Sequence, residues 1–259
     1  MSILEEIFAE KRARVASCKP SGLDDVKARA ADAGPVRPFS AALLSSAHRP
    51  SLIAEVKRMS PSQGVICPDF RPLEIAAAFE SVGADCLSVL TDEKWFGGSE
   101  EVFRAIRPTV ALPMLRKDFV VDEYDVYAAR AMGADAILLI VAGLTLGQLS
   151  GFQGLAWELG MDVLVEVHTA GEAEIALASG AKMIGVNNRN LHDFVENLET
   201  TESIFPRLSR ESLLVSESSL KLNADVHRVA AAGARSVLIG TAFCRSDDPG
   251  GAVRSIMGW

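Results

Sequence analysis

Short apolar runs alternate with longer amphipathic stretches from residue 51 to the end of the chain. Four of the apolar runs follow a Gly-Ala pair and one charged residue, with the glycines at Gly83, Gly133, Gly180 and Gly233. A glycine at such a place typically ends a helix in a left-handed conformation, and a strand follows it. Successive pairs stand about 50 residues apart, which is enough for two strand–helix units and predicts one further strand within each interval.

These further strands are found as apolar runs midway between the Gly-Ala pairs. They cover residues 112–115, 162–165 and 212–215, and residues 51–56 form another run ahead of the first pair. Eight parallel strands, each followed by a helix, close into a (β/α)8 TIM barrel of the α/β class. A doubly wound sheet would instead need a glycine-rich nucleotide turn after its first strand, where this chain has Glu55, Lys57 and Arg58.

The first 50 residues show helical periodicity and no strand. Ser2 and Glu5 form a capping-box sequence, which predicts the start of a helix. The predicted helices cover residues 3 to about 16, 23–33 and 39–44. They have too few apolar residues for a core of their own. We therefore expect residues 1–50 to pack as a helical extension on a barrel of residues 51–259, within a single domain.

The chain of 259 residues has a formal net charge of −8. Nucleic-acid-binding proteins usually carry a basic surplus, so this charge argues against such a partner. The four cysteines are scattered without a Cys-x-x-Cys pair, which favours free thiols in a reducing compartment. The acidic N-terminus is unlike a signal peptide, and no run approaches the roughly 18 apolar residues of a membrane span. We expect a cytoplasmic protein that binds neither nucleic acid nor a membrane.

Polar and charged side chains stand at the C-terminal ends of the predicted strands, where barrel enzymes carry their active sites. Glu55 and Lys57 end the first strand and, being two residues apart, project on the same side. Only the fourth strand ends apolar, around Leu138 and Ile140. Because a buried charge without a partner is costly, this convergence indicates a functional site.

The residue types at these ends narrow the chemistry. They include two lysines, three glutamates and an Asn-x-Arg sequence but no cysteine, and the four histidines lack the spacing of metal ligands. Neighbouring lysines and glutamates suit proton transfer, because each tunes the pKa of the other. Short residues after the first, seventh and eighth strands suit a phosphate group. The sequence therefore predicts acid–base chemistry on a phosphorylated substrate, without metal or cofactor.

Five motifs stand at the strand ends in a fixed order. They are Glu-Val-Lys-Arg-x-Ser-Pro-Ser from residue 55, Leu-Arg-Lys-Asp-Phe from 115, Glu-Val-His from 166, Gly-Val-Asn-Asn-Arg-Asn-Leu from 185 and Ser-Glu-Ser from 216. Together they closely resemble the indole-3-glycerol-phosphate synthase family. The resemblance extends from about Ser51 to the end, and the N-terminal helices are similar to extra helices that precede the barrel in that family.

This resemblance implies an enzyme of tryptophan biosynthesis that closes the pyrrole ring of indole. The implied substrate is 1-(2-carboxyphenylamino)-1-deoxyribulose 5-phosphate, which would lose carbon dioxide and water without the help of a cofactor. Lys117 resembles the general acid that protonates the substrate carbonyl, and Glu166 the base of the later dehydration. Lys57 resembles the cation that faces the substrate carboxylate and is a second candidate for the acid of the dehydration.

The resemblance assigns the other matched positions to holding and binding. Glu55 and Glu217 resemble carboxylates that hold the lysines and the substrate, and Asn187 and Arg189 resemble positioning groups. The walls of the aromatic pocket fall on Phe96 and Leu138. The phosphate positions, which act partly through backbone amides, fall on Ser60, Ser218, Ser219, Gly240 and Thr241.

Two positions depart from the family pattern. The family usually has glycine where this chain has Ser219, and a serine held at positive φ carries strain of about 1 kcal/mol or more. Its hydroxyl, on the other hand, supplies a further group for the phosphate. Asp193 stands where the family often has threonine, and we expect little consequence for the chemistry.

Two other functions are compatible with the residues. One is a Schiff-base lysine aldolase acting on a sugar phosphate, with Lys117 or Lys57 as the nucleophile. The other is a catalytically impaired barrel that serves as a binding partner, which Ser219 alone suggests. For the chain as a whole we expect a monomer or a weak homo-oligomer.

Overall fold

A closed barrel of parallel strands lies at the centre of the protein. The computed structural model describes residues 2–190, 194–208 and 211–259, so that Asp193 lies outside the described residues. The barrel strands run in the spatial order β1-β10-β9-β8-β7-β6-β5-β4. Their bounds are β1 (Ser51–Val56), β4 (Cys86–Leu90), β5 (Met114–Lys117), β6 (Ala136–Ile140), β7 (Asp162–Val167), β8 (Met183–Asn187), β9 (Leu213–Glu217) and β10 (Ser236–Ile239). The predicted (β/α)8 TIM barrel is confirmed.

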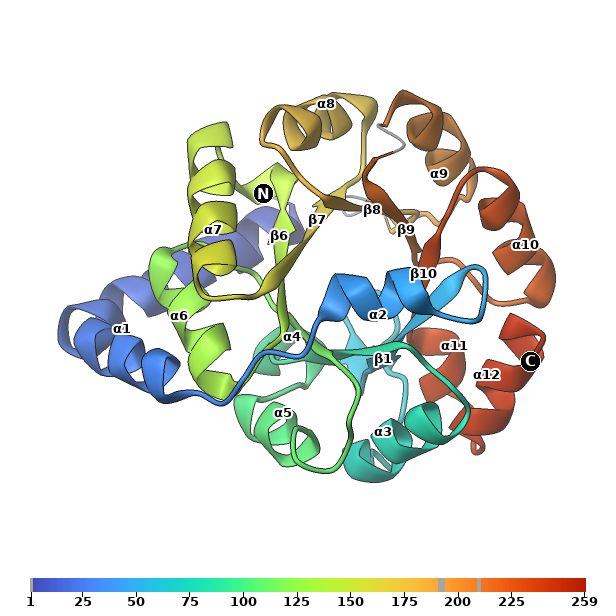
Figure 1. The fold of residues 1–259 in the computed structure, drawn as a ribbon, viewed down its shortest axis with the longest axis horizontal. Coiled ribbons are helices and arrows are strands. Elements are labelled where there is room, and N and C mark those ends of the chain that lie inside the picture. The colour runs from blue at the N-terminus through green and yellow to red at the C-terminus, as the bar shows by residue number, and fades with distance from the viewer. Residues whose placement is uncertain (1, 191–193, 209–210) are drawn as a thin grey trace.

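Helices alternate with the strands and surround the barrel (Figure 1). The outer ring comprises α3 (Pro72–Ser81), α5 (Glu100–Ile106), α6 (Glu123–Met132), α7 (Leu146–Glu158), α8 (Ala170–Ala178), α9 (Glu199–Ile204), α10 (Asn223–Ala231) and α12 (Pro249–Met257). Shorter pieces follow strand ends: α4 (Glu93–Phe96), α11 (Thr241–Cys244), the 3-10 turns η1 (Val141–Gly143) and η2 (Phe205–Arg207), and a small hairpin of β2 (Met59–Ser60) and β3 (Gly64–Val65). The loops and short elements that follow the strands thus lie together at one end of the barrel, where they can form a site.

The repeated glycines act as predicted. Gly83, Gly133, Gly180 and Gly233 all have positive φ, from 77° to 114°, and each stands between a helix and the next strand. A side chain at these positions would strain the backbone, which explains why glycine recurs there. The strand predicted at residues 112–115 begins instead at Met114, because a proline at 113 has no N–H to donate to the ladder.

Strand alternation positions the first charged residue of the site. On β1, the side chains of Leu52 and Ala54 pack in the layer between barrel and helices, whereas Ile53 packs in the cluster inside the barrel. Glu55 has the same parity as Ile53 and therefore projects inward at the C-terminal end of the strand. Interior packing below this point is complete, with Ile53 and Leu115 fully buried.

The N-terminal segment forms one long helix, α1 (Ile3–Asp32), where the sequence predicted two. Its capping box is present, because the Ser2 N–H donates to the Glu5 carboxylate at 2.7 Å. The predicted break between residues 16 and 23 is wrong, and Pro20 lies within the helix. Packing against α6 outweighs the cost of the proline, since Arg14 pairs with Asp125 of α6 at 2.6 Å.

The second N-terminal helix, α2 (Phe39–Ser45), crosses the barrel opening nearest the viewer in Figure 1. The Ser40 N–H donates to Asp162, the first residue of β7, at 2.8 Å. This contact places α2 at the N-terminal ends of the strands, so it closes the end of the barrel opposite to the charged strand ends. In the described part of the chain, no helix is both long enough and apolar enough to span a membrane.

Candidate active site

A cavity of about 370 Å³ opens at the C-terminal ends of the barrel strands. Every site residue predicted from the sequence lines this cavity. The wall also includes Ile3, Leu4 and Ile7 of α1 and Phe119 after β5, which the sequence did not predict. No sequence motif predicted that the three α1 residues line the cavity, because their position depends on where the first turns of that helix pack.

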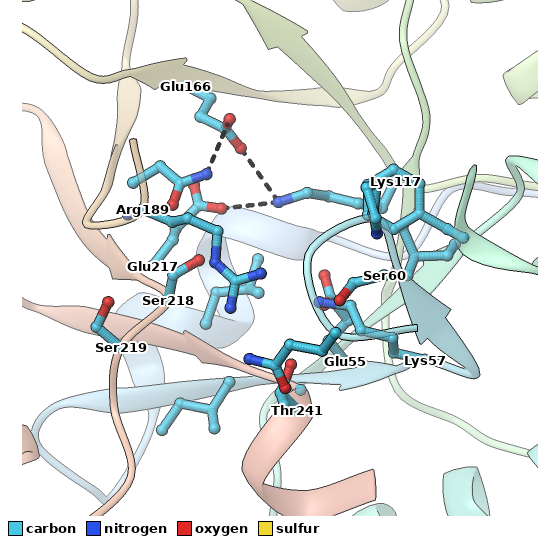
Figure 2. A pocket seen from close by; sticks show the side chains of 18 of the residues that line it. Glu55, Lys57, Ser60, Lys117, Glu166, Arg189, Glu217, Ser218, Ser219 and Thr241 are labelled. Atoms are coloured by element: carbon cyan, nitrogen blue, oxygen red, sulfur yellow. Dashed lines mark hydrogen bonds and ion pairs between the residues drawn. The ribbon is translucent and has the colours of Figure 1, made fainter. Parts of the chain in front are cut away.

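Lys117 occupies the centre of the charged cluster (Figure 2). It ends β5, and its Nζ lies 2.8 Å from Glu217 Oε2 and 3.2 Å from Glu166 Oε2. Both carboxylates are almost completely buried. Asn187 donates from Nδ2 to the other oxygen of Glu166 at 3.2 Å. Lys117 therefore pairs with these two glutamates.

The charges of this cluster shift the pKa values of Lys117, Glu166 and Glu217 away from their usual ranges. Burial would lower the pKa of Lys117, but the charges of Glu217, Glu166 and Glu55 outweigh it and raise that pKa well above its usual range. Burial would raise the pKa of Glu166, but the Lys117 charge, together with His168 and Asn187, outweighs burial and holds that pKa well below its usual range. At Glu217, burial and the repulsion of Glu166 prevail over Lys117 and raise the pKa to about 7.

This charge state argues against an aldolase. A Schiff-base lysine must attack as a neutral amine, and enzymes that use one lower its pKa. Lys117 is surrounded by carboxylates that do the opposite, so the site suits an ammonium that donates a proton.

Glu55 and Lys57 form a second ion pair on the neighbouring sector. Lys57 Nζ contacts Glu55 Oε1, and Ser88 of β4 donates to the other carboxylate oxygen at 3.3 Å. Burial would raise the pKa of Glu55, but the charges of Lys57 and Lys117 lower it. The predicted shared direction of the two side chains is thus present in the structure, and Lys57 lines the cavity.

Two glycines provide the space that the buried glutamates occupy. A Cβ at Gly185 of β8 would collide with the Glu217 carboxylate, and one at Gly240 would collide with Glu55. Gly185 was missed as a site residue. A glycine inside the apolar strand run Met-Ile-Gly-Val was the available signal, since such a residue often marks a close approach of other groups.

Ser218 and Ser219, after β9, and Thr241, after β10, lie at a different part of the cavity from Glu166, whereas Ser60 lies beside Lys57 (Figure 2). Ser218 and Ser219 both have a φ of 64°, so two successive residues adopt the left-handed conformation. Ser219 Oγ is buried and makes no hydrogen bond to the described residues. A buried hydroxyl without a partner is costly. It therefore marks a place for a hydrogen-bonding ligand.

Arg189 connects the loops after β8 and β1. Its guanidinium contacts Ser62 Oγ and pairs with Glu196, whose other carboxylate oxygen pairs with Lys221 at 2.6 Å. This arrangement agrees with the expectation that Arg189 fixes neighbouring groups. Ser60 lies beside this junction, with its Oγ 3.5 Å from that of Ser62.

Asn188 is a further residue that sequence reasoning missed. It is buried, and its Nδ2 donates to Ser216 Oγ at 2.9 Å and to the Glu217 carbonyl at 3.0 Å. Its Oδ1 accepts from Thr201 Oγ1 of α9 at 2.8 Å. Asn188 thus holds the end of β9, from which Glu217 and Ser218 project. The repeated asparagine of the Asn-Asn-Arg motif was its only signal.

Aromatic and apolar side chains form the remaining wall. The rings of Phe96 and Phe119 lie with centroids 6.0 Å apart, and Phe8 of α1 packs edge-on against Phe119 at 5.6 Å. Leu138 of β6 lines the same cavity and is almost fully buried. Across the described residues, no group of three or more His, Cys, Asp or Glu side chains is arranged to hold a metal ion.

The fold and the site define a class of protein, namely a (β/α)8 barrel with a buried lysine paired with buried carboxylates in a cavity at the C-terminal ends of its strands. The family model described as indole-3-glycerol phosphate synthase matches residues 4–256. Indole-3-glycerol phosphate synthase of Neisseria gonorrhoeae is 49% identical over 255 residues, which cover 97% of each chain. That of Azoarcus sp. is 47% identical over 261 residues, or 99% of each chain.

The chain belongs to the indole-3-glycerol phosphate synthase family. It is a carboxy-lyase of tryptophan biosynthesis and acts on a phosphorylated small molecule. Among solved structures, a mutant tryptophan synthase alpha-subunit from Pyrococcus furiosus is similar with a TM-score of 0.61 at 14% identity, covering 82% of this chain and 99% of that one. A mandelate oxidase mutant gives 0.60 at 17% identity, covering 81% and 72%. These two likenesses concern the fold alone.

Proposed function

We propose that Lys117 is the general acid and Glu166 the general base of indole-3-glycerol phosphate formation in this chain. The observation that carries the proposal is the pairing of the Lys117 ammonium with the Glu166 carboxylate at 3.2 Å inside the cavity, with opposite pKa shifts. Acid and base are thereby present together in the protonation states that the reaction requires at its start.

In the first step, the ring carbon that bears the carboxylate attacks the ketone carbon of the deoxyribulose. The carbonyl oxygen takes the Lys117 proton as the new carbon–carbon bond forms. Because a developing alkoxide is a much stronger base than a lysine amine, this transfer remains favourable although the pKa of Lys117 is raised. Carbon dioxide then leaves, and its bonding electrons restore the aromatic ring.

In the second step, the new hydroxyl leaves as water with a proton from a lysine. Glu166 removes a hydrogen from the adjacent carbon, the one bonded to nitrogen, and the pyrrole double bond forms. Lys57, which directly follows β1 on another sector of the cavity, faces the substrate carboxylate. Glu55 and Glu217 hold the two lysines, and Asn187 holds the base.

The other cavity residues bind the substrate. Arg189 fixes the loops over the cavity, and Phe96 and Leu138 flank the aromatic ring. The phosphate is held by the small residues near the ends of β1, β9 and β10. These are Ser60, Ser218, Ser219, Gly240 and Thr241.

The organisation of the chain is also part of the proposal. Residues 1–50 form an extension that packs on the barrel of residues 51–259 as one domain, supported by the buried ion pair of Lys11 with Asp118 at 2.7 Å. The protein works in the cytoplasm as a monomer or weak homo-oligomer, without nucleic-acid or membrane partners.

Steady-state turnover of the carboxyphenylamino-deoxyribulose phosphate tests the two roles. Lys117→Ala and Glu166→Gln are each expected to lose activity by at least about 100-fold, the usual contribution of a general acid or base. Lys182→Ala and Glu158→Gln, which change exposed residues outside the cavity, serve as matched controls with unchanged turnover. Unchanged turnover in Lys117→Ala or Glu166→Gln would refute the role assigned to that residue. If the well-folded wild-type protein binds this substrate but does not turn it over, the result would support the alternative of a catalytically impaired barrel.

A further inference from the structure

His168 stands beside the proposed base. It follows β7 directly, two residues after Glu166, and its Nε2 lies 3.2 Å from Glu166 Oε1, which is ion-pair distance without the alignment of a hydrogen bond. The same oxygen accepts from Asn187, whereas the other oxygen faces Lys117. The Glu166 carboxylate is therefore held between two basic groups, one at each oxygen. His168 is itself largely buried, with 10% of its side chain exposed.

A second carboxylate holds the imidazole from the opposite side. The His168 backbone N–H donates to Glu172 Oε2 at 2.7 Å, and its ring Nδ1 lies 3.3 Å from the same oxygen. Glu172 lies in the first turn of α8, where its own N–H donates to Thr169 Oγ1 at 3.2 Å. The ring thus lies between one carboxylate from the strand and one from the helix. These are the two acidic groups that pair with it among the described residues.

This environment gives the imidazole a positive charge at neutral pH. Burial alone would lower the pKa of His168, but its hydrogen bonds and charge interactions with Glu166 and Glu172 outweigh burial and raise that pKa to about 9. The charge of His168 therefore acts on Glu166 Oε1, while that of Lys117 acts on Glu166 Oε2.

The positive charge of His168 helps to keep Glu166 ionised when the neighbouring Lys117 loses its proton. Lys117 and Glu166 lie 3.2 Å apart, so a direct proton transfer between them would remove both working states at once. When Lys117 gives its proton to the substrate, Glu166 also loses the cation that keeps it ionised. A second cation at Glu166 Oε1 continues to stabilise the carboxylate through this moment.

We propose that His168 is a positioning residue which, as an imidazolium clamped by Glu172, keeps Glu166 ionised and oriented while Lys117 transfers its proton. The inference rests on the acid and base roles proposed above. It predicts a dependence on Glu172, which lies outside the cavity lining and has no role in the reaction steps.

Histidine NMR titration of the full-length protein tests the charge without any turnover. The resonance that disappears in His168→Gln is expected to titrate near pH 9, and to titrate lower in Glu172→Gln. A wild-type titration near the ordinary value of about 6.5 would overturn the proposal. Should Lys117→Ala or Glu166→Gln retain full activity, the proposed acid–base roles fail, and the titration reports on His168 all the same.

The pH dependence of kcat tests whether turnover depends on the positive charge of His168. In the wild type, kcat is expected to fall as pH rises through about 9, where His168 loses its proton. Glu172→Gln should move this basic limb toward neutral pH and leave the acidic side in place. Glu174→Gln, an exposed change on the same helix, is the matched control with a wild-type profile.

His168→Gln removes the positive charge while it keeps a neutral polar side chain next to Glu166. We expect kcat to fall about tenfold, with little change in KM and no basic limb near pH 9. Wild-type kcat in His168→Gln, or an unmoved basic limb in Glu172→Gln, would show that the imidazole only fills space and would overturn the proposal.

Discussion

Replacement of Ser219 by glycine separates two effects that this residue combines. Ser219 has a φ of 64°, where a side chain costs about 1–2 kcal/mol relative to glycine. Its Oγ is buried and lacks a protein partner among the described residues, which leaves it available to the substrate phosphate. The substitution Ser219→Gly therefore removes strain and a phosphate ligand together, whereas Ser219→Ala removes the ligand and keeps the strain.

The expected magnitudes follow from these two terms. Glycine loses roughly 0.4–1 kcal/mol through its more flexible unfolded chain, so Ser219→Gly should be more stable than Ser219→Ala by about 0.5–1 kcal/mol, or about 2 °C in Tm. A hydrogen bond to a charged group contributes about 1.5–3 kcal/mol. Both variants should therefore bind substrate about 10- to 100-fold more weakly, with a smaller change in kcat.

Two assays measure these quantities. Urea unfolding of the wild type, Ser219→Gly and Ser219→Ala gives the differences in stability. Inhibition by inorganic phosphate gives the affinity of the phosphate-binding residues independently of the reaction. Equal stability of Ser219→Gly and Ser219→Ala would refute the strain argument. Phosphate inhibition as strong in Ser219→Ala as in the wild type would refute the hydroxyl as a ligand.

Three further perturbations test the packing and charge of the site. Gly185→Ala should displace the Glu217 carboxylate and lower kcat at least about tenfold, while far-UV circular dichroism stays native; wild-type kcat would contradict the close approach. Lys11→Met should leave the buried Asp92 without its ion pair, and Asp118 with Arg116 alone, and lower the free energy of unfolding by roughly 3–5 kcal/mol; a loss below about 1 kcal/mol would show that the Lys11 pairs are dispensable. The wild-type kcat/KM should fall as pH drops through about 7, because the raised pKa of Glu217 means that it becomes neutral there and releases Lys117; a flat profile down to pH 5 would exclude this requirement.

The barrel could be predicted from the sequence because the sequence features that indicate it are local and recur along the chain. Each Gly-Ala pair marks a helix end, and the polar residues interrupt apolar strands where the strands end. The continuous helix α1 was not readable, because Pro20 locally signals a stop and only contacts with a helix about 100 residues away keep the helix intact.

The candidate site was predictable to the extent that its residues carry charge. Lys117, Glu166 and Glu217 are unusual at strand ends, whereas Gly185 and Asn188 act by leaving space and by holding backbone. Their effects exist only between neighbouring strands, so a single sequence indicates them weakly. The α1 contribution to the cavity wall likewise depends on tertiary packing.

Rapid quenching of Glu166→Gln with the carboxyphenylamino-deoxyribulose phosphate, followed by mass analysis, tests the division of labour most directly. If Lys117 closes the ring and Glu166 acts only in dehydration, this variant should accumulate a species that has lost carbon dioxide but not water. Lys117→Ala should release no carbon dioxide in the same experiment. Direct formation of indole-3-glycerol phosphate by Glu166→Gln at the wild-type rate, or accumulation of unchanged substrate alone, would contradict the account.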